Sequence, residues 1–266
     1  MSEAAITVRK ASFTRDGFTV LNDVSVDFPA GRTTLLLGPS GSGKTTLLKI
    51  AAGLFPPDRG RARYRGVDLT AVSGEQEREL RRELGFAFQD GALWQNMTVF
   101  QNLALPLQYH YPRMLRREMQ ARIDRLVSGF PIRRHMELRP AALSAGERKI
   151  VSFLRALVLD PRVLFFDEPT SSVDNQSAER IENILADRRR RGVTLIGISH
   201  NAQLTARLAD YLLIMIGGAV RAFGPVRQVA ATGDREVQTV LSDVLADAAS
   251  FDGDILELLD GADGEP

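Results

Sequence analysis

The chain has 266 residues, of which 44% are apolar, with a net charge of +1 and no cysteine. A chain of this size and apolar content can bury a large core, which excludes a small scaffold held together by disulfides. The absence of cysteine also excludes cysteine-ligated zinc and fits a reducing cytoplasm. No window approaches the ~18 continuous apolar residues of a membrane span, and the first residues contain no apolar signal core. We therefore expect any membrane role to depend on a partner protein.

Charge is distributed unevenly along the chain. Residues 233–266 contain ten acidic side chains and one basic side chain, Arg235, so this tail carries −9 and residues 1–232 carry +10. We predict a boundary there, with a partly helical tail because apolar residues from Val237 to Leu245 recur at helical spacing. A nucleic-acid-binding surface usually has a denser basic patch with interleaved aromatic residues. Solvated helix faces are the favoured interpretation of the basic body, and we expect no nucleic-acid partner.

Two segments of alternating apolar residues open the chain. Residues 6–8 and 20–28 predict antiparallel strands of a small sheet. The apolar run Leu35–Leu37 predicts a buried strand, which leads into a glycine-rich turn and then an apolar helix over residues 47–52. The turn has the spacing G-x-x-x-x-G-K-[ST]. It consists of Gly38, Pro39, Ser40, Gly41, Ser42, Gly43, Lys44, Thr45 and Thr46.

Each part of this turn suits the phosphates of a nucleotide. Glycine residues allow the backbone to curl until successive N–H groups point inward, and the following helix adds the positive end of its dipole. Lys44 supplies a positive charge, and the Thr45 hydroxyl can reach Mg²⁺. An ordinary glycine turn between a strand and a helix would not need Lys-Thr at the start of the helix. We therefore predict a phosphate-binding P-loop.

The middle of the chain combines polar and apolar elements. Residues 61–68 predict a short strand, and residues 73–82 predict a polar helix. Residues 84–88 predict a buried strand that ends on Gln89. Residues 90–111 are rich in large apolar side chains, some of which should pack inside while others contact a partner. An apolar stripe over residues 113–127 predicts a helix. Its arginine-rich face is either solvated, the favoured interpretation, or in contact with lipid headgroups.

The second half of the chain alternates helices and strands. Ser144, with Glu147 three residues later, predicts a capping box at the start of a helix that extends to about residue 160. A polar helix is predicted over residues 176–191, closed by four arginines that suit the negative end of its dipole. Apolar strands are predicted over residues 163–166, 193–198 and 211–216. This alternation indicates a parallel sheet buried between helices.

Polar residues stand directly after three of these strands. Gln89, Asp167, Glu168 and His200 all follow apolar runs. Because ligand chemistry collects at the carboxyl ends of parallel strands, we expect these side chains at one edge of the sheet. Asp167 can hold Mg²⁺, and Glu168 can orient and deprotonate an attacking water. Taken alone, Gln89 and His200 could equally be ordinary strand exits.

The order of these motifs resembles that of the ATP-binding cassette (ABC) ATPases, from Ile6 to about Gln228. In that family the glycine-rich turn is Walker A and the strand with Asp167 and Glu168 is Walker B. The resemblance further implies the remaining functional segments. These are the Q-loop residue Gln89, the signature Leu143-Ser144-Ala145-Gly146-Glu147, the D-loop Ser171-Ser172-Val173-Asp174, the switch residue His200 and the adenine-stacking residue Phe13. Membership of another class, the P-loop kinases, would explain neither the signature nor His200.

The resemblance implies a fold and a mode of action. The fold would be α/β, a P-loop NTPase (RecA-like) core with a mostly parallel sheet, an N-terminal antiparallel β subdomain and an inserted helical subdomain at about residues 92–160, together forming an ATPase domain over residues 1–232. The cofactors would be ATP and Mg²⁺, with Thr45, Gln89 and Asp167 as metal ligands. Two copies would sandwich two ATP molecules, and Ser144, Ala145, Gly146, Glu147 and Asp174 would contribute to the nucleotide site.

The same resemblance implies partners and a location. A membrane permease would dock near residues 89–111, with substrate-binding or small regulatory subunits as further partners. The ATPase would then be cytoplasmic and peripheral at the inner face of the cell membrane. The signature departs from the usual pattern at Ala145, where the family has Gly, and at Glu147, where it has Gln. Ala145 could alter the backbone freedom of the loop.

One segment carries the interpretation of the transported cargo. Residues 89–107 are similar to lipid-trafficking ATPases of the Mla/Mce type, with Gly-Ala-Leu-aromatic after Gln89 and a later Pro-Leu. Parts of the segment also occur in lipoprotein-releasing and methionine-import ATPases. The sequence therefore predicts phospholipid or lipid trafficking, with lipoprotein release or small-molecule import as the alternatives. A soluble ABC protein acting on nucleic acid is a further alternative.

Overall fold

The computed structural model describes residues 3–246. The chain forms two compact units, unit 1 (Met1–Val72 with Leu185–Pro266) and unit 2 (Ser73–Ile184). The first part of the predicted acidic tail contains helix α9 (Arg235–Ala246). The rest of that tail lies outside the described residues.

Unit 1 contains an antiparallel sheet built from the N-terminal segments. Its strands are β1 (Ala4–Arg15), β2 (Phe18–Pro29), β4 (Arg59–Tyr64) and β5 (Val67–Asp68), in the order β2-β1-β4-β5. Ile6 pairs with Phe28 and Val8 with Val26, and all four side chains are buried, which confirms the predicted alternation. The single strand predicted over residues 61–68 is instead two strands. They are separated by a tight turn at Arg65 and Gly66, both with positive φ.

A second sheet of unit 1 carries the P-loop. The strands are β3 (Thr33–Leu37), β8 (Thr194–Ile198), β9 (Tyr211–Ile216) and β10 (Ala219–Pro225). β3 runs parallel to both β8 and β9, and β10 turns back antiparallel to β9. Every residue of β3 and β8 is buried, as expected for parallel strands covered on both faces. The helices of this unit include α1 (Lys44–Ala51), α7 (Ala202–Leu208) and α8 (Val226–Ala230).

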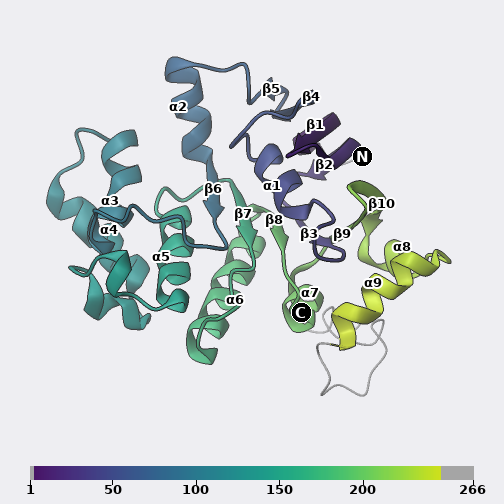
Figure 1. The fold of residues 1–266 in the computed structure, drawn as a ribbon. Helices are drawn as coiled ribbons and strands as arrows, with labels where there is room; N and C mark the ends of the chain where they lie inside the picture. Colours follow the sequence, from purple (N-terminus) through teal and green to yellow (C-terminus); the bar gives the residue numbers. More distant parts are fainter. Residues whose placement is uncertain (1–2, 247–266) are drawn as a thin grey trace. The chain divides into compact units, whose positions relative to one another are not determined.

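Unit 2 combines a parallel strand pair with a group of helices (Figure 1). Strands β6 (Leu84–Ala87) and β7 (Val163–Asp167) lie side by side, and α5 (Ala145–Leu157) packs against them. Helix α6 (Asn175–Arg190) begins in unit 2, and its residues from Leu185 onward belong to unit 1. The remaining elements are α2 (Gly74–Glu83), α3 (Val99–His110), α4 (Arg116–Val127) and the 3₁₀ turns η1 (Pro131–His135) and η2 (Pro140–Ala142).

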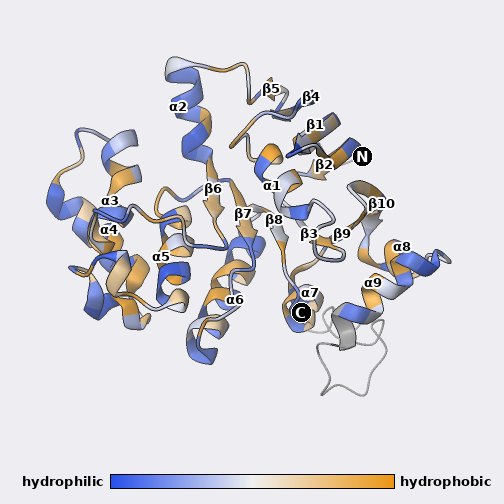
Figure 2. Ribbon diagram, in the orientation of Figure 1, coloured by the Kyte–Doolittle hydropathy of each residue, from blue (hydrophilic) through white to orange (hydrophobic). Residues whose placement is uncertain are grey.

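The helices of unit 2 differ in how much apolar surface they bury. Helix α2 has no buried residue and is hydrophilic along most of its length (Figure 2). Helix α5 buries Ile150, Leu154 and Leu157 among others, at the spacing of an apolar helix face. In α4 the stripe holds for Met119, Ile123 and Val127. Leu115, which we expected to share that stripe, stands before the helix and is exposed, because the helix begins only at Arg116.

Candidate functional site

The P-loop of unit 1 depends on glycine where its backbone passes close to two strands. Gly38 has a φ of 145° and Gly43 a φ of 93°, both in the region that favours glycine. A Cβ atom at Gly38 would lie 2.1 Å from the carbonyl oxygen of Met215 in β9. At Gly43 it would lie 2.7 Å from the carbonyl oxygen of Val20 in β2. These approaches explain why the loop has glycine at both positions.

The polar groups of the loop are arranged to receive an anion. Lys44 is only 7% exposed, and its Nζ donates to the carbonyl oxygens of Gly38 at 2.7 Å and Pro39 at 2.9 Å. Ser42 is 3% exposed, and its hydroxyl has no hydrogen-bond partner within the described part of the chain. Helix α1 has no acidic residue in its first turn, so the positive end of its dipole is not neutralised there. The buried hydroxyl, the lysine and the helix terminus together fit a nucleotide's phosphates.

Two further predicted residues, His200 and Phe13, belong to unit 1. Leu36 of β3 lies opposite Ile198 of β8, so the P-loop and His200 leave the same edge of this sheet. His200 is exposed, and the next residue, Asn201, fixes the backbone there. The Asn201 side chain accepts the Leu204 N–H at 2.9 Å and caps α7.

Phe13 lies on β1 of the antiparallel sheet and is half-buried. Its ring centroid is 5.2 Å from that of Phe55. The structure therefore gives Phe13 an aromatic neighbour and a partly exposed ring, which are both compatible with stacking on an adenine base.

In unit 2 three predicted residues leave one edge of the β6–β7 pair. Ala87 lies opposite Phe166, so Gln89 and the acidic residues Asp167 and Glu168 follow adjacent strand ends. Asp167 is buried, whereas Gln89 is exposed. Glu168 has a φ of 50°, a conformation that non-glycine residues rarely adopt and that clusters at functional sites.

The signature segment forms the N-terminus of α5 and packs on the D-loop. A Cβ atom at Gly146 would lie 2.5 Å from the carbonyl oxygen of Ser172, so this glycine is required by packing. Ala145 is the first residue of α5, where helical backbone accepts a side chain without strain. The substitution at Ala145 therefore costs the loop no backbone freedom that it needs. Asp174 ends the D-loop, and its Oδ1 accepts the Ser177 N–H at 2.9 Å, which lowers the pKa of Asp174.

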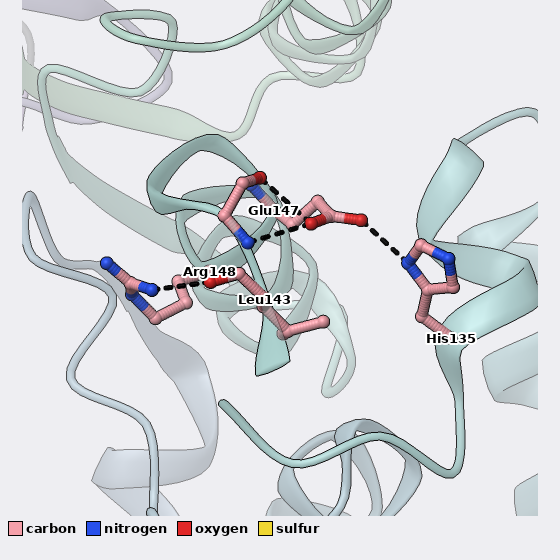
Figure 3. Close-up of polar contacts among 5 residues, drawn as sticks. His135, Leu143, Glu147 and Arg148 are labelled. Carbon is pink, nitrogen blue, oxygen red and sulfur yellow. Dashed lines mark hydrogen bonds and ion pairs between the residues drawn. The ribbon is translucent and has the colours of Figure 1, made fainter. Parts of the chain in front are cut away.

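The capping box predicted at Ser144 is present (Figure 3). The Ser144 N–H and hydroxyl both donate to Glu147 Oε2 at 2.8 Å, and the Glu147 N–H donates back to Ser144 Oγ at 3.2 Å. The other oxygen, Oε1, lies 2.6 Å from Nδ1 of His135 in η1. Arg148 Nη1 donates to the carbonyl oxygen of Leu143 at 2.6 Å, which fixes the residue before Ser144.

The carboxyl group of Glu147 is held in its ionised form. Partial burial acts to raise its pKa, but hydrogen bonds from the Ser144 N–H and hydroxyl and the contact with His135 hold the pKa below its ordinary value. Because an ionised carboxylate only accepts hydrogen bonds, Nδ1 of His135 carries the hydrogen in this contact. His135 was not singled out from the sequence, and nothing in the local pattern connects it with the signature.

Helix α5 also holds the D-loop through a buried lysine that was not predicted from the sequence. Lys149 Nζ donates to the carbonyl oxygen of Ser171 at 2.9 Å and also contacts the Ser171 hydroxyl. Burial lowers the pKa of Lys149, an effect opposed by the charges of Glu168 and Asp167. Ser171 Oγ in turn donates to the carbonyl oxygen of Glu168 at 3.2 Å. A lysine so close to the apolar stripe of α5 was the available signal, because lysine is rarely buried without a partner.

The same helix holds the backbone on both sides of Gln89. The Phe88 N–H donates to Ser152 Oγ at 3.0 Å. Arg155 Nη2 donates to the carbonyl oxygens of Ala92 at 2.8 Å and Gly91 at 3.2 Å. Burial lowers the pKa of Arg155 to about 10. Helix α5 therefore connects the signature, the D-loop and the Q-loop within unit 2.

Comparison with known proteins agrees with this geometry. The sequence model of the ABC transporter family matches residues 21–171. The chain is 37% identical over 235 residues to the nickel import ATP-binding protein NikO of Rhodobacter capsulatus, covering 85% of this chain and 91% of that protein. It is 34% identical over 240 residues to the sulfate/thiosulfate import ATP-binding protein CysA of Acinetobacter baylyi, covering 89% of this chain but only 65% of that protein.

Solved structures show the same fold. A dimeric structure of a bacterial ABC transporter cassette superposes with a TM-score of 0.77 at 26% identity, covering 84% of this chain and 99% of that chain. A dimeric post-hydrolysis state of an ATP-binding cassette bound to ADP and phosphate superposes with a TM-score of 0.75 at 25% identity, with the same coverage.

The chain belongs to the ABC transporter family. Its fold is the predicted one, with an antiparallel β subdomain, a mostly parallel sheet and a helical insertion, and the protein is an ABC ATPase that binds ATP. The described residues contain no group of three or more His, Asp or Glu side chains that could hold a metal ion.

The relatives found by comparison do not support the predicted lipid cargo. NikO and CysA are named for the import of nickel and of sulfate/thiosulfate. A further relative, 34% identical over 221 residues, is the molybdate/tungstate import ATP-binding protein WtpC of Archaeoglobus fulgidus. None of these three is a lipid-trafficking ATPase. The similarity of residues 89–107 to such ATPases was therefore a weak guide to cargo. Within residues 3–246, no helix has the length and apolar content to cross a bilayer.

Proposed function

We propose that this protein is the ATP-hydrolysing subunit of an importer for a small inorganic ion, of the kind represented by nickel, sulfate or molybdate. The observation that carries the proposal is the 37% identity to a nickel import ATPase across 91% of that protein's length. The sulfate and molybdate import ATPases found at 34% identity support the same class of cargo. Which of these ions is carried would depend on the membrane subunits.

We further propose that two copies bind two ATP molecules between them. The dimeric state of two structurally similar cassettes supports this arrangement. The P-loop of one copy would hold the phosphates through its backbone amides, Lys44 and the buried hydroxyl of Ser42. Ser144 and Gly146 of the second copy would address the γ-phosphate from the N-terminus of α5. Phe13 would stack on the adenine, and Asp174 would contribute to the nucleotide site.

The chemistry of hydrolysis is assigned to the acidic strand ends. Glu168 would accept a proton from the attacking water, and His200 and Gln89 would orient the groups around it. Mg²⁺, when bound, supplies positive charge that stabilises the developing charge on the phosphates. Its proposed protein ligands are Thr45, Gln89 and Asp167, which offer the oxygen atoms that this ion prefers.

The membrane partner is proposed to dock on the segment around residues 89–111. This segment presents Trp94 and Tyr109 as exposed large side chains of unit 2. Exposed aromatic groups of this kind are typical of protein interfaces. The ATPase would act at the cytoplasmic face of the membrane through this contact, with substrate-binding or small regulatory subunits as further partners.

The test is transport by the complete complex. The full chain would be purified with its membrane subunits, placed in lipid vesicles and supplied with ATP, and the uptake of nickel, sulfate and molybdate measured separately. ATP-dependent uptake of one ion supports the proposal. Movement of phospholipid with no ion uptake would instead favour lipid trafficking. A salt-sensitive mobility shift with nucleic acid would favour the soluble class of ABC protein.

A further inference from the structure

The signature serine of this chain is engaged by a carboxylate. Its N–H and its hydroxyl both donate to Glu147 Oε2 at 2.8 Å (Figure 3). A serine hydroxyl has one hydrogen to donate, so Ser144 cannot give the same hydrogen to a phosphate while Glu147 accepts it. Hydrogen bonds to an ionised acceptor are roughly twice as strong as those between neutral groups. Glu147 therefore competes with any phosphate for the Ser144 hydroxyl.

His135 opposes this competition from the other side. Its Nδ1 donates to Glu147 Oε1 at 2.6 Å, from the last residue of η1. This contact draws the carboxylate toward η1 and satisfies one of its oxygens. It also places a hydrogen-bond donor beside the negative charge of Glu147. The position of Glu147 thus depends on two partners that pull in opposite directions.

We propose that Glu147, held by His135, is a positioning residue that controls the release of Ser144 to the nucleotide of a second copy. It thereby sets the ATP concentration at which two copies associate. The proposal rests on the ATP-bound dimer described above. The two residues act through Ser144, and neither is required to touch the nucleotide.

The neighbouring contacts explain why the rest of the segment would stay in place. Arg148 holds the carbonyl oxygen of Leu143 at 2.6 Å, and its own N–H donates to the Ser144 carbonyl oxygen at 3.0 Å. Gly146 is packed against the Ser172 carbonyl oxygen. These contacts hold the backbone on both sides of Ser144 without using the Glu147 carboxylate, whose backbone contact is with the Ser144 N–H. The segment can therefore stay in place while the serine hydroxyl changes partner.

The test compares Glu147→Gln with His135→Ala in the full-length protein. Glutamine can keep the capping box but carries no charge, so it holds the Ser144 hydroxyl less strongly. The dimer fraction would be measured by sedimentation velocity against the concentration of the non-hydrolysable analogue AMP-PNP. We expect Glu147→Gln to lower the half-maximal concentration roughly tenfold and His135→Ala to raise it. In the double variant the effect of His135→Ala should disappear, because its target carboxylate is absent.

Two controls separate this effect from general damage. Glu137→Gln removes the same charge from an exposed residue near η1 and should leave the dimer fraction unchanged. The affinity of each monomeric variant for a fluorescent ADP should also stay constant, because the P-loop lies in unit 1. If Glu147→Gln and the wild type associate at the same concentration, the inference is wrong while the proposed dimer stands. If neither the wild type nor any variant associates at any AMP-PNP concentration, the inference and the proposed dimer are both wrong.

Discussion

Glu168 is the single residue on which turnover is expected to depend most strongly. It follows the buried strand β7 with a φ of 50°, and its carbonyl oxygen accepts the Ser171 hydroxyl. We predict that Glu168→Gln keeps ATP binding but lowers the hydrolysis rate by about 10²–10⁴, the usual contribution of a general base. Phosphate release and nucleotide affinity would be measured on the same preparation. An unchanged hydrolysis rate would refute the assignment of Glu168 as the base.

Individual residues differ in how far the sequence revealed them. The P-loop could be predicted because all of its groups lie within nine consecutive residues, so local spacing contains the site. His135 could not, because its partner Glu147 is distant in sequence and meets it only after η1 packs on α5. For Lys149 the sequence offered a lysine beside an apolar stripe but no partner, because Ser171 meets it only after the D-loop packs on α5. Ala145 looked like a defect in the signature. The structure explains why it is accommodated and why Gly146 is not replaceable.

At the scale of the elements, α5 lies very close to strand β6. A Cβ atom at Gly85 of β6 would lie 2.4 Å from the carbonyl oxygen of Ala156 and 2.9 Å from Cγ of Pro161. We predict that Gly85→Ala pushes the end of α5 away and lowers the free energy of unfolding by about 2 kcal/mol, a typical cost of overpacking. Urea denaturation of the full chain would measure it.

The matched control for this prediction is Gly233→Ala. A Cβ atom there meets nothing within 4 Å, so its effect should stay within about 0.5 kcal/mol. Because α5 also holds the backbone around Gln89 through Ser152 and Arg155, the Gly85→Ala variant should lose ATPase activity as well. Equal stability of the two variants would show that α5 can shift without cost.

The elements that the sequence predicted well are those with an unambiguous apolar pattern. Helix α5 carries a cap and a continuous apolar stripe, and β3, β7 and β8 are short apolar runs with polar ends. Helix α3 was not recognised, although Thr98 and Gln101 form a capping box there, because Pro106 and apolar residues on several sides obscure its period. Strand β10 was missed because its burial does not alternate.

At the scale of the whole molecule, the predicted site residues are divided between the two units, and each group is positioned by the elements of its own unit. The P-loop, Phe13 and His200 are positioned by the sheets of unit 1, and the strand-end acids, signature and D-loop by α5 and the β6–β7 pair of unit 2. The local motifs therefore predicted fold, activity and cofactor. They could not predict cargo, because the residues that select an ion would belong to the membrane subunits.

Attachment to those subunits should depend on exposed aromatic surface of unit 2. Trp94 is 56% exposed, whereas Phe100 is half-buried and its N–H donates to the Met136 carbonyl oxygen, so Trp94 is the better probe. We predict that Trp94→Glu abolishes co-purification of the membrane subunits without changing the unfolding midpoint, because a charge in the centre of an interface leaves a desolvated group unpaired. Phe18→Glu, at a 77% exposed position of unit 1, is the control and should keep the complex intact. Retention of the membrane subunits by Trp94→Glu would place the docking surface elsewhere, and loss of the complex in both variants would indicate a general effect of added charge.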